Sequence, residues 1–272
     1  MKLYIVADME GICGVVSSSQ VSGPDTWETE QVRRQFSEEV AAVCAGAIEA
    51  GVDEIVVNDF HGNGRNLLPE RLPVQTMLVR GGFRVSSGFD MLDSTFGGLV
   101  ILGAHARTGT RNCVLPHTYS ERLHFELFGQ PIAEFDLISL VAGEQKVPTL
   151  LISGDSKTIE QAQATLSAAL TVVTKFPIGN TGILCMHPKQ ICEMLREETK
   201  RAIKSADSTE PPLISPPIPL VIRIRDIELG DRLDWIPSLK RLDDDTFEFV
   251  GESMLEIAKL VYGVTLLTTP GL

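Results

Sequence analysis

The segment Leu3-Tyr4-Ile5-Val6-Ala7-Asp8-Met9-Glu10-Gly11 decides the fold of this chain. Its apolar half is typical of a buried strand, and two carboxylates follow where the strand ends. Because side chains on extended backbone alternate between two faces, Asp8 and Glu10 point to the same side. Open α/β sheets bind ligands at the carboxyl ends of their strands. The segment therefore predicts a pair of oxygen ligands at one edge of a sheet.

Two further apolar runs each lead to a histidine. Residues 55–57 lead to His61, and residues 99–102 lead to His105. Between the first two runs, a helix should begin near residues 25–26 and stop at Gly51. This β-α-β order predicts parallel strands joined by a right-handed crossover. The ends of the parallel strands would then bring both histidines close to the two carboxylates.

The rest of the chain predicts one larger and one smaller unit. We expect a polar loop over residues 105–123, a hairpin over 123–134, helices over 158–173, 189–206 and 253–262, and a last strand over 264–267. A proline-rich stretch over 211–219 is the clearest linker-like segment. The predicted fold class is α/β: a mainly parallel sheet with flanking helices over residues 1–186, and a smaller C-terminal α+β unit over residues 187–272.

Composition excludes several classes of function. The formal net charge of −12 argues against nucleic-acid binding, which depends on Lys and Arg. No apolar run reaches the ~20 residues that span a bilayer, so we expect no membrane segment. Asp8 and Glu10 interrupt the only apolar candidate for a signal peptide, and the five cysteines lack C-x-x-C spacing. We therefore expect reduced thiols and a cytoplasmic protein.

Histidine and carboxylate side chains at strand ends favour a metal site. Zinc takes imidazole nitrogen and carboxylate oxygen, and catalytic zinc keeps an open position for water. Three of the five histidines, His61, His105 and His117, fall in loops that follow predicted strands. A single histidine in such a loop is more often only hydrogen-bonded. The joint pattern with Asp8 and Glu10 indicates metal ligands.

These motifs resemble a known family. Residues 8–11, 57–62, 65–67 and 103–106, followed by His117-Thr118, resemble the DppA-type zinc-dependent D-aminopeptidases, peptidase family M55. The likeness runs in order from the N-terminus to about residue 155. It implies two zinc ions per subunit, held by five side chains: Asp8, Glu10, His61, His105 and Glu134. With Asp8 bridging, Glu10 and His105 would complete one zinc site, and His61 and Glu134 the other.

The resemblance also implies an activity. It implies a metallo-aminopeptidase that uses metal-activated water to release the N-terminal residue, D-configured, from short peptides or amino acid amides, with a catalytic role for His117. An imidazole that titrates near 6.5 suits proton transfer. It implies a homo-oligomer as well, a decamer of two stacked rings. Phe60 stands where the family usually has a small residue, which leaves the side-chain preference open.

Two other functions remain as alternatives. Phosphoesterase-like two-metal hydrolases typically open with D-x-H and carry a later G-N-H run, whereas this chain has Asp8-Met9-Glu10, and Gly62-Asn63 follows His61. The second alternative is a catalytically silent relative that serves as an oligomeric peptide-binding component. Such a protein would not need its metal-ligating residues, yet every candidate side chain is present. The glycines at 62 and 64 lack nucleotide-binding spacing, so no organic cofactor is expected.

Overall fold

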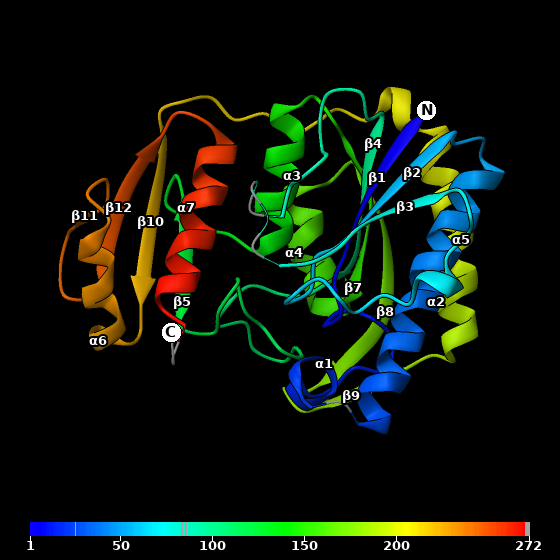
Figure 1. Ribbon diagram of the computed structural model, residues 1–272, viewed down its shortest axis with the longest axis horizontal. Coiled ribbons are helices and arrows are strands. Elements are labelled where there is room, and N and C mark those ends of the chain that lie inside the picture. The colour runs from blue at the N-terminus through cyan, green and yellow to red at the C-terminus, as the bar shows by residue number, and fades with distance from the viewer. Residues whose placement is uncertain (25, 83, 85, 87, 270–272) are drawn as a thin grey trace.

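Two β-sheets organise the chain (Figure 1). The computed structural model describes residues 1–24, 26–82, 84, 86 and 88–269. The larger sheet has the strand order β3-β2-β1-β4-β7-β8-β9, and the smaller has the order β11-β12-β10-β5-β6. The strands of the larger sheet are β1 (Lys2–Ala7), β2 (Glu54–Asp59), β3 (Thr76–Val79), β4 (Gly98–Ala104), β7 (Thr149–Asp155), β8 (Leu170–Ile178) and β9 (Gly182–Cys185).

Strand β1 lies in the middle of the strands that carry the predicted site. It pairs in parallel with β2 on one side and with β4 on the other, and Ala7 lies opposite both Asp59 and Leu102. Parallel strands in this register end at one edge of the sheet. Apart from the antiparallel pair β8–β9, the paired strands of this sheet are parallel within the described residues, so the predicted mainly parallel sheet is confirmed.

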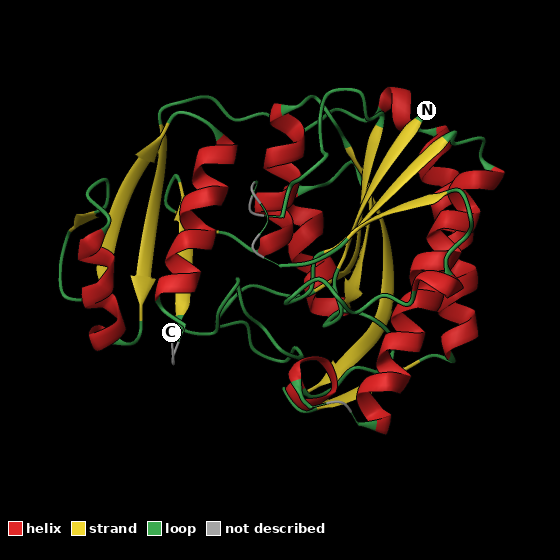
Figure 2. Cartoon of the chain, viewed as in Figure 1, coloured by secondary structure: helices red, strands yellow, loops and turns green. Residues whose placement is uncertain are grey.

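Helices cover both faces of the larger sheet (Figure 2). Helices α2 (Trp27–Glu49) and α5 (Pro188–Lys204) pack together on one face, and α3 (Glu134–Glu144) and α4 (Ser156–Thr165) pack on the other. Alternation along β1 supplies both cores, because Leu3 and Ile5 face α2 whereas Tyr4 and Val6 face the other side. The sheet is therefore buried on both faces, which explains its continuous apolar runs.

The smaller sheet is antiparallel and draws its strands from two parts of the chain. It contains β5 (Leu123–Leu127), β6 (Gln130–Pro131), β10 (Ile218–Ile224), β11 (Lys240–Arg241) and β12 (Thr246–Gly251). Strand β5 pairs with β10, while α5 packs against α2 of the larger layer. Both contacts cross residue 186, and the division into units at that residue stays a prediction. The remaining short helices are α1 (Ser18–Ser22), α6 (Ile227–Gly230) and the 3₁₀ helices Pro69–Arg71, Ala206–Ser208 and Asp231–Trp235.

The predicted terminal strand over 264–267 is wrong. These residues end helix α7 (Met254–Leu267), which lies between the smaller sheet and α3 (Figure 1). The helix begins at Ser253, whose side chain accepts a hydrogen bond from the backbone N–H of Glu256. The apolar stripe of Ile257 and Val261 continues to Val264 with helical spacing, so tertiary burial outweighs the local β-branched composition.

The predicted helix over 158–173 is also wrong in its second half. Helix α4 ends at Thr165, and the β-branched run over 171–174 forms the first part of β8, parallel to β7. The helix predicted over 189–206 is confirmed as α5. Among the described residues, no helix is both long and apolar enough to cross a membrane.

Candidate metal centre

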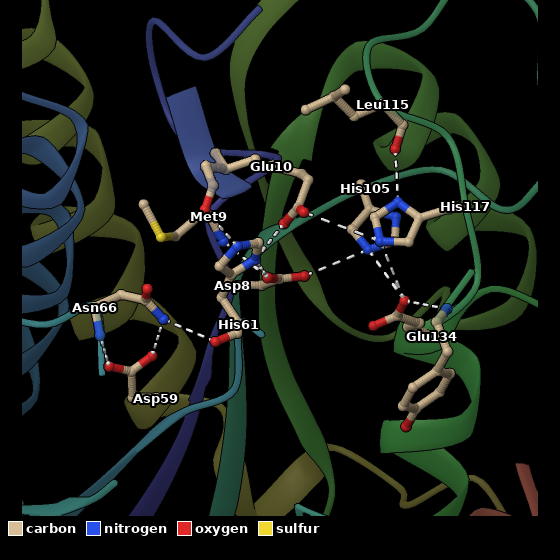
Figure 3. Close-up of polar contacts among 12 residues, drawn as sticks. Asp8, Met9, Glu10, Asp59, His61, Asn66, His105, Leu115, His117 and Glu134 are labelled. Atoms are coloured by element: carbon tan, nitrogen blue, oxygen red, sulfur yellow. Dashed lines mark hydrogen bonds and ion pairs between the residues drawn. The ribbon is translucent and has the colours of Figure 1, made fainter. Parts of the chain in front are cut away.

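Six predicted side chains meet at the carboxyl edge of the larger sheet (Figure 3). The loops after β1, β2 and β4 supply four of them, residue 117 comes from the loop over 105–122, and the first residue of α3 supplies the last. All except His117 are buried. We call this group the cluster: Asp8, Glu10, His61, His105, His117 and Glu134.

Asp8 occupies the centre of the cluster. Its Oδ1 lies 3.0 Å from Nδ1 of His61, and its Oδ2 lies 3.4 Å from Nε2 of His105. One carboxylate therefore faces two imidazoles with two different oxygens. That arrangement suits a carboxylate that bridges two cations.

Glu10 and Glu134 lie on opposite sides of this centre. Glu10 Oε2 lies 3.0 Å from His61 Nδ1, and Glu134 Oε1 lies 3.3 Å from His105 Nε2. Donor atoms of Asp8, Glu10 and His105 also lie within 4.8 Å of one another. The shortest contacts thus pair His61 with Glu10. By contrast, the family resemblance implies that His105 and Glu10 share one zinc ion. The assignment of ligands to each ion stays a prediction.

Backbone carbonyls orient all three imidazoles. Nε2 of His61 lies 3.0 Å from the Val21 carbonyl oxygen, and Nδ1 of His117 lies 2.9 Å from that of Leu115. For His105 the corresponding contact is 3.3 Å, from Nδ1 to the carbonyl of the next residue. A ring nitrogen that donates to a carbonyl leaves the second nitrogen with a free lone pair, as in metal-ligating histidines. In each ring this second nitrogen faces the carboxylates.

The donor set fits a divalent metal. His105 Nε2 is buried and makes no hydrogen bond within the described structure, although two carboxylates face it. Such an orphaned nitrogen is costly unless a ligand satisfies it. Imidazole nitrogen combined with carboxylate oxygen is the donor chemistry of zinc.

Charge is concentrated in this buried space. Burial acts to raise the pKa of Asp8, but the adjacent imidazoles of His105 and His61 outweigh it and hold the pKa well below its usual range. Burial acts to lower the pKa of His61 and His105, but the adjacent carboxylates outweigh it and hold both values well above the usual range. A bound cation would take the place of these imidazole protons, since ligation requires the neutral ring.

His117 differs from the other two histidines. Its ring stacks on His105 with 3.9 Å between ring centroids and 6° between ring planes. Its Nε2 lies 3.7 Å from Glu134 Oε1 and 4.0 Å from Glu10 Oε1, and its side chain is 21% exposed. His117 is therefore beside the cluster and accessible from the adjacent cavity.

A cavity of about 470 Å³ lies over the cluster. One wall consists of cluster residues, and helix α7 lines another with Tyr262, Thr265 and Leu266. The rings of Phe60 and Tyr119, 6.1 Å apart, add an aromatic surface. The helix predicted over 253–262 includes Tyr262, but Thr265 and Leu266 fall in the stretch predicted as a strand, and Tyr119 was not predicted as a site residue. The helical spacing that continues from residue 257 to 264 was the signal that would have extended the predicted helix.

Asp59 supports the site through the backbone. Its carboxylate accepts hydrogen bonds from the backbone N–H groups of Asn66 (2.6 Å) and Leu67 (2.8 Å). The Asn66 amide in turn donates to the carbonyl of His61 at 2.7 Å. Asp59 thus fixes the loop that carries His61 rather than touching the imidazole.

Taken together, an α/β fold with carboxylates and imidazoles gathered beside a cavity defines a metallohydrolase. The chain belongs to the M55 peptidase family, because the family model described as D-aminopeptidase matches residues 1–262. The protein is accordingly a hydrolase of the metallopeptidase class. The similarity extends well beyond residue 155, where the recognisable sequence motifs end.

Similarity in sequence and in structure shows the same relationship. A D-aminopeptidase of Bacillus subtilis (strain 168) is 31% identical over 261 residues, which cover 94% of this chain and 93% of that protein. The solved structure of the Zn-dependent D-aminopeptidase DppA from Bacillus subtilis, a self-compartmentalizing protease, matches with a TM-score of 0.94. It is 29% identical, and the match covers 98% of each chain.

Proposed function

We propose that this protein is a zinc-dependent aminopeptidase that hydrolyses the N-terminal, D-configured residue from short peptides or amino acid amides. The observation that carries the proposal is the meeting of carboxylates and imidazoles from separate strand ends beneath one cavity. Similarity to a D-aminopeptidase and to the Zn-dependent D-aminopeptidase DppA of Bacillus subtilis supports the choice of substrate and metal.

Five side chains would hold two zinc ions: Asp8, Glu10, His61, His105 and Glu134. Asp8 would bridge, because its two oxygens face different histidines. When bound, zinc lowers the pKa of water from ~15.7 to near 7 and polarises a carbonyl oxygen. The buried carboxylates balance the charge of the ions, and the backbone carbonyls hold the imidazoles in the ligating orientation.

His117 would move the proton. Because Nδ1 contacts the Leu115 carbonyl, Nε2 carries the lone pair on the cavity side. Nε2 can take a proton from the attacking water and deliver it to the leaving amine, as a new C–O bond forms and the C–N bond breaks. The donor atoms of His117, His105 and Glu134 lie within 4.8 Å of one another, and this proximity supports a role for His117 beside the metal ions.

The subunits would assemble into a homo-oligomer, with a decamer as the form expected from the family. The self-compartmentalizing relative supports this. Exposed apolar side chains on the β8–β9 hairpin support it as well, because Ile178 is 66% and Leu184 is 62% exposed. A cytoplasmic location is in keeping with five free cysteines.

The proposal is tested by assaying matched D- and L-aminoacyl amides with parallel metal analysis. We expect hydrolysis of the D-amides, loss of activity with a chelator and recovery with zinc. Hydrolysis of neither amide and no bound metal would instead indicate a catalytically silent relative. Metal-dependent cleavage of a phosphate ester, without amide hydrolysis, would indicate the phosphoesterase alternative.

A further inference from the structure

A lysine is buried beneath the loop that carries Glu10. Lys175, in strand β8, has 0% of its surface exposed. None of the ion pairs within the described residues includes it. Lysine is almost never fully buried without a partner, because desolvation of the ammonium is costly. The position of this charge therefore needs a structural reason.

Three backbone carbonyls surround the ammonium. Nζ donates hydrogen bonds to the carbonyl oxygens of Glu10, Ile12 (3.0 Å) and Val15 (2.8 Å). An ammonium has three N–H donors, so each donor has one acceptor. All three acceptors belong to the segment over residues 8–15, which we call the β1 loop. The β1 loop thus winds around the lysine.

Two other side chains complete this support. The hydroxyl of Thr174, the preceding residue of β8, donates to the Gly11 carbonyl. Glu39 of α2 accepts a hydrogen bond from the Cys13 N–H at 2.9 Å. Side chains of β8 and α2 therefore satisfy a run of backbone groups that a loop otherwise leaves to water.

On its opposite side, the β1 loop packs closely against β4. The Gly11 N–H donates to the Gly103 carbonyl at 2.8 Å, and a Cβ at Gly11 would lie 1.9 Å from the Ala104 carbonyl oxygen. Only glycine fits this approach. The loop is held between β4 and Lys175, so the backbone at Glu10 is fixed in one position.

We propose that Lys175 is a positioning residue of the metal site: its ammonium fixes the backbone of Glu10 and so sets where the Glu10 carboxylate lies. This inference rests on the proposed function, in which Glu10 is a ligand. Lys175 is not among the described residues that line the cavity. It therefore acts through Glu10 and touches no substrate. Outer partners of metal ligands are typically worth 10–100-fold in metal affinity.

The test compares zinc affinity, by chelator competition, in Lys175→Met and Thr174→Val. Lys175→Met removes the donors but keeps a flexible apolar stem, and we expect zinc to bind about 10–100-fold more weakly. Thr174→Val removes a single donor with little change in shape, and we expect a smaller loss of several-fold together with a lower kcat. If Lys175→Met does not fold, the zinc affinity of Thr174→Val tests the inference instead.

The matched control is Thr199→Val. Thr199 is as fully buried as Thr174 and also donates to a backbone carbonyl, that of Leu195, but in α5. It should lose comparable stability and keep the zinc affinity of the wild type. Wild-type affinity in a folded Lys175→Met, wild-type affinity in Thr174→Val where Lys175→Met does not fold, or an equal loss in Thr199→Val would overturn the inference. Failure of the wild type to bind zinc would refute the proposed function itself.

Discussion

At the residue scale, the orientation of the imidazoles depends on backbone carbonyls of helix α1 and of the loop over residues 105–122. The sequence predicts that Asp8, Glu10, His61 and His105 share one edge of the sheet, because each follows a parallel strand, whereas Glu134 is predicted only through the family resemblance. It does not predict the Val21 or Leu115 carbonyls that orient His61 and His117, since these contacts arise from how helix α1 and the loop over 105–122 fold back on the site. Four of the candidate ligands were therefore accessible from strand patterning, and the backbone groups that orient the imidazoles were not.

Replacement of His117 by alanine should separate catalysis from metal binding. General acid–base groups contribute about 10²–10⁴-fold to rate, so we expect kcat to fall by that amount. Because His117 is not assigned as a ligand, the zinc content should stay at the wild-type value. Steady-state kinetics and metal analysis measure both quantities, and His124→Ala is the control. Full activity in the alanine variant, or loss of zinc from it, would contradict the assigned role.

The buried carboxyl of Glu39 should make the free energy of unfolding depend on pH. Burial, opposed by hydrogen bonds from Gln35 and Cys13, raises the pKa of its carboxyl from 4.5 to about 7. The folded protein therefore holds this proton more tightly than the unfolded chain, so stability falls as the pH rises from 4.5 to about 7. Glu39→Gln keeps the acceptor for Cys13 and removes the charge. Its advantage over the wild type should grow with pH, to about 2–3 kcal/mol above pH 7.

Urea unfolding of metal-free wild type and Glu39→Gln at pH 5 and pH 8 measures this difference. Chelation removes metal binding as a second source of pH dependence. Titrations shared by the two proteins cancel in the comparison. A difference in unfolding free energy that is the same at both pH values would mean that Glu39 does not titrate in this range.

At the scale of the element, the segments that were predicted well have patterns decided locally. Strands β1, β2 and β4 are short apolar runs bounded by polar residues, and α2 combines an N-cap at Thr26 with a long apolar stripe. The end of helix α7 and the first part of strand β8 were mispredicted because β-branched residues occur in both, and tertiary burial decided between helix and strand. The part of the cavity wall that Thr265 and Leu266 form was therefore missed.

The α7 wall should influence side-chain preference. Leu266 lines the cavity opposite the cluster, so Leu266→Ala would enlarge the space available to the N-terminal side chain. We expect kcat/KM for a D-leucyl amide to rise several-fold relative to a D-alanyl amide, since one methylene changes discrimination by roughly 10–200-fold at most. Lys259→Ala, on an exposed position of the same helix, is the control. An unchanged ratio of the two kcat/KM values in Leu266→Ala would mean that the N-terminal side chain of the substrate does not lie against Leu266.

At the scale of the whole molecule, the β8–β9 hairpin is an exposed apolar edge of the larger sheet. Edge strands that expose apolar side chains are sites of association. We expect Ile178→Asp combined with Leu184→Asp to reduce the assembled mass measured by light scattering after size exclusion. Val250→Asp, at a 50% exposed position of the smaller sheet, introduces the same chemistry elsewhere and should leave the assembly intact. An unchanged mass in the double variant would exclude the hairpin as an interface.

The central claim is that separate strand ends together hold two divalent ions. Anomalous diffraction at the zinc edge, on crystals of the wild type and of Asp8→Asn grown with zinc, tests it most directly. We expect two peaks per subunit, about 3.5–4 Å apart and on either side of Asp8, and the loss of at least one peak in the variant. A wild-type map without a peak between Glu10 and Glu134, or with peaks only at other places on the protein, would contradict the claim.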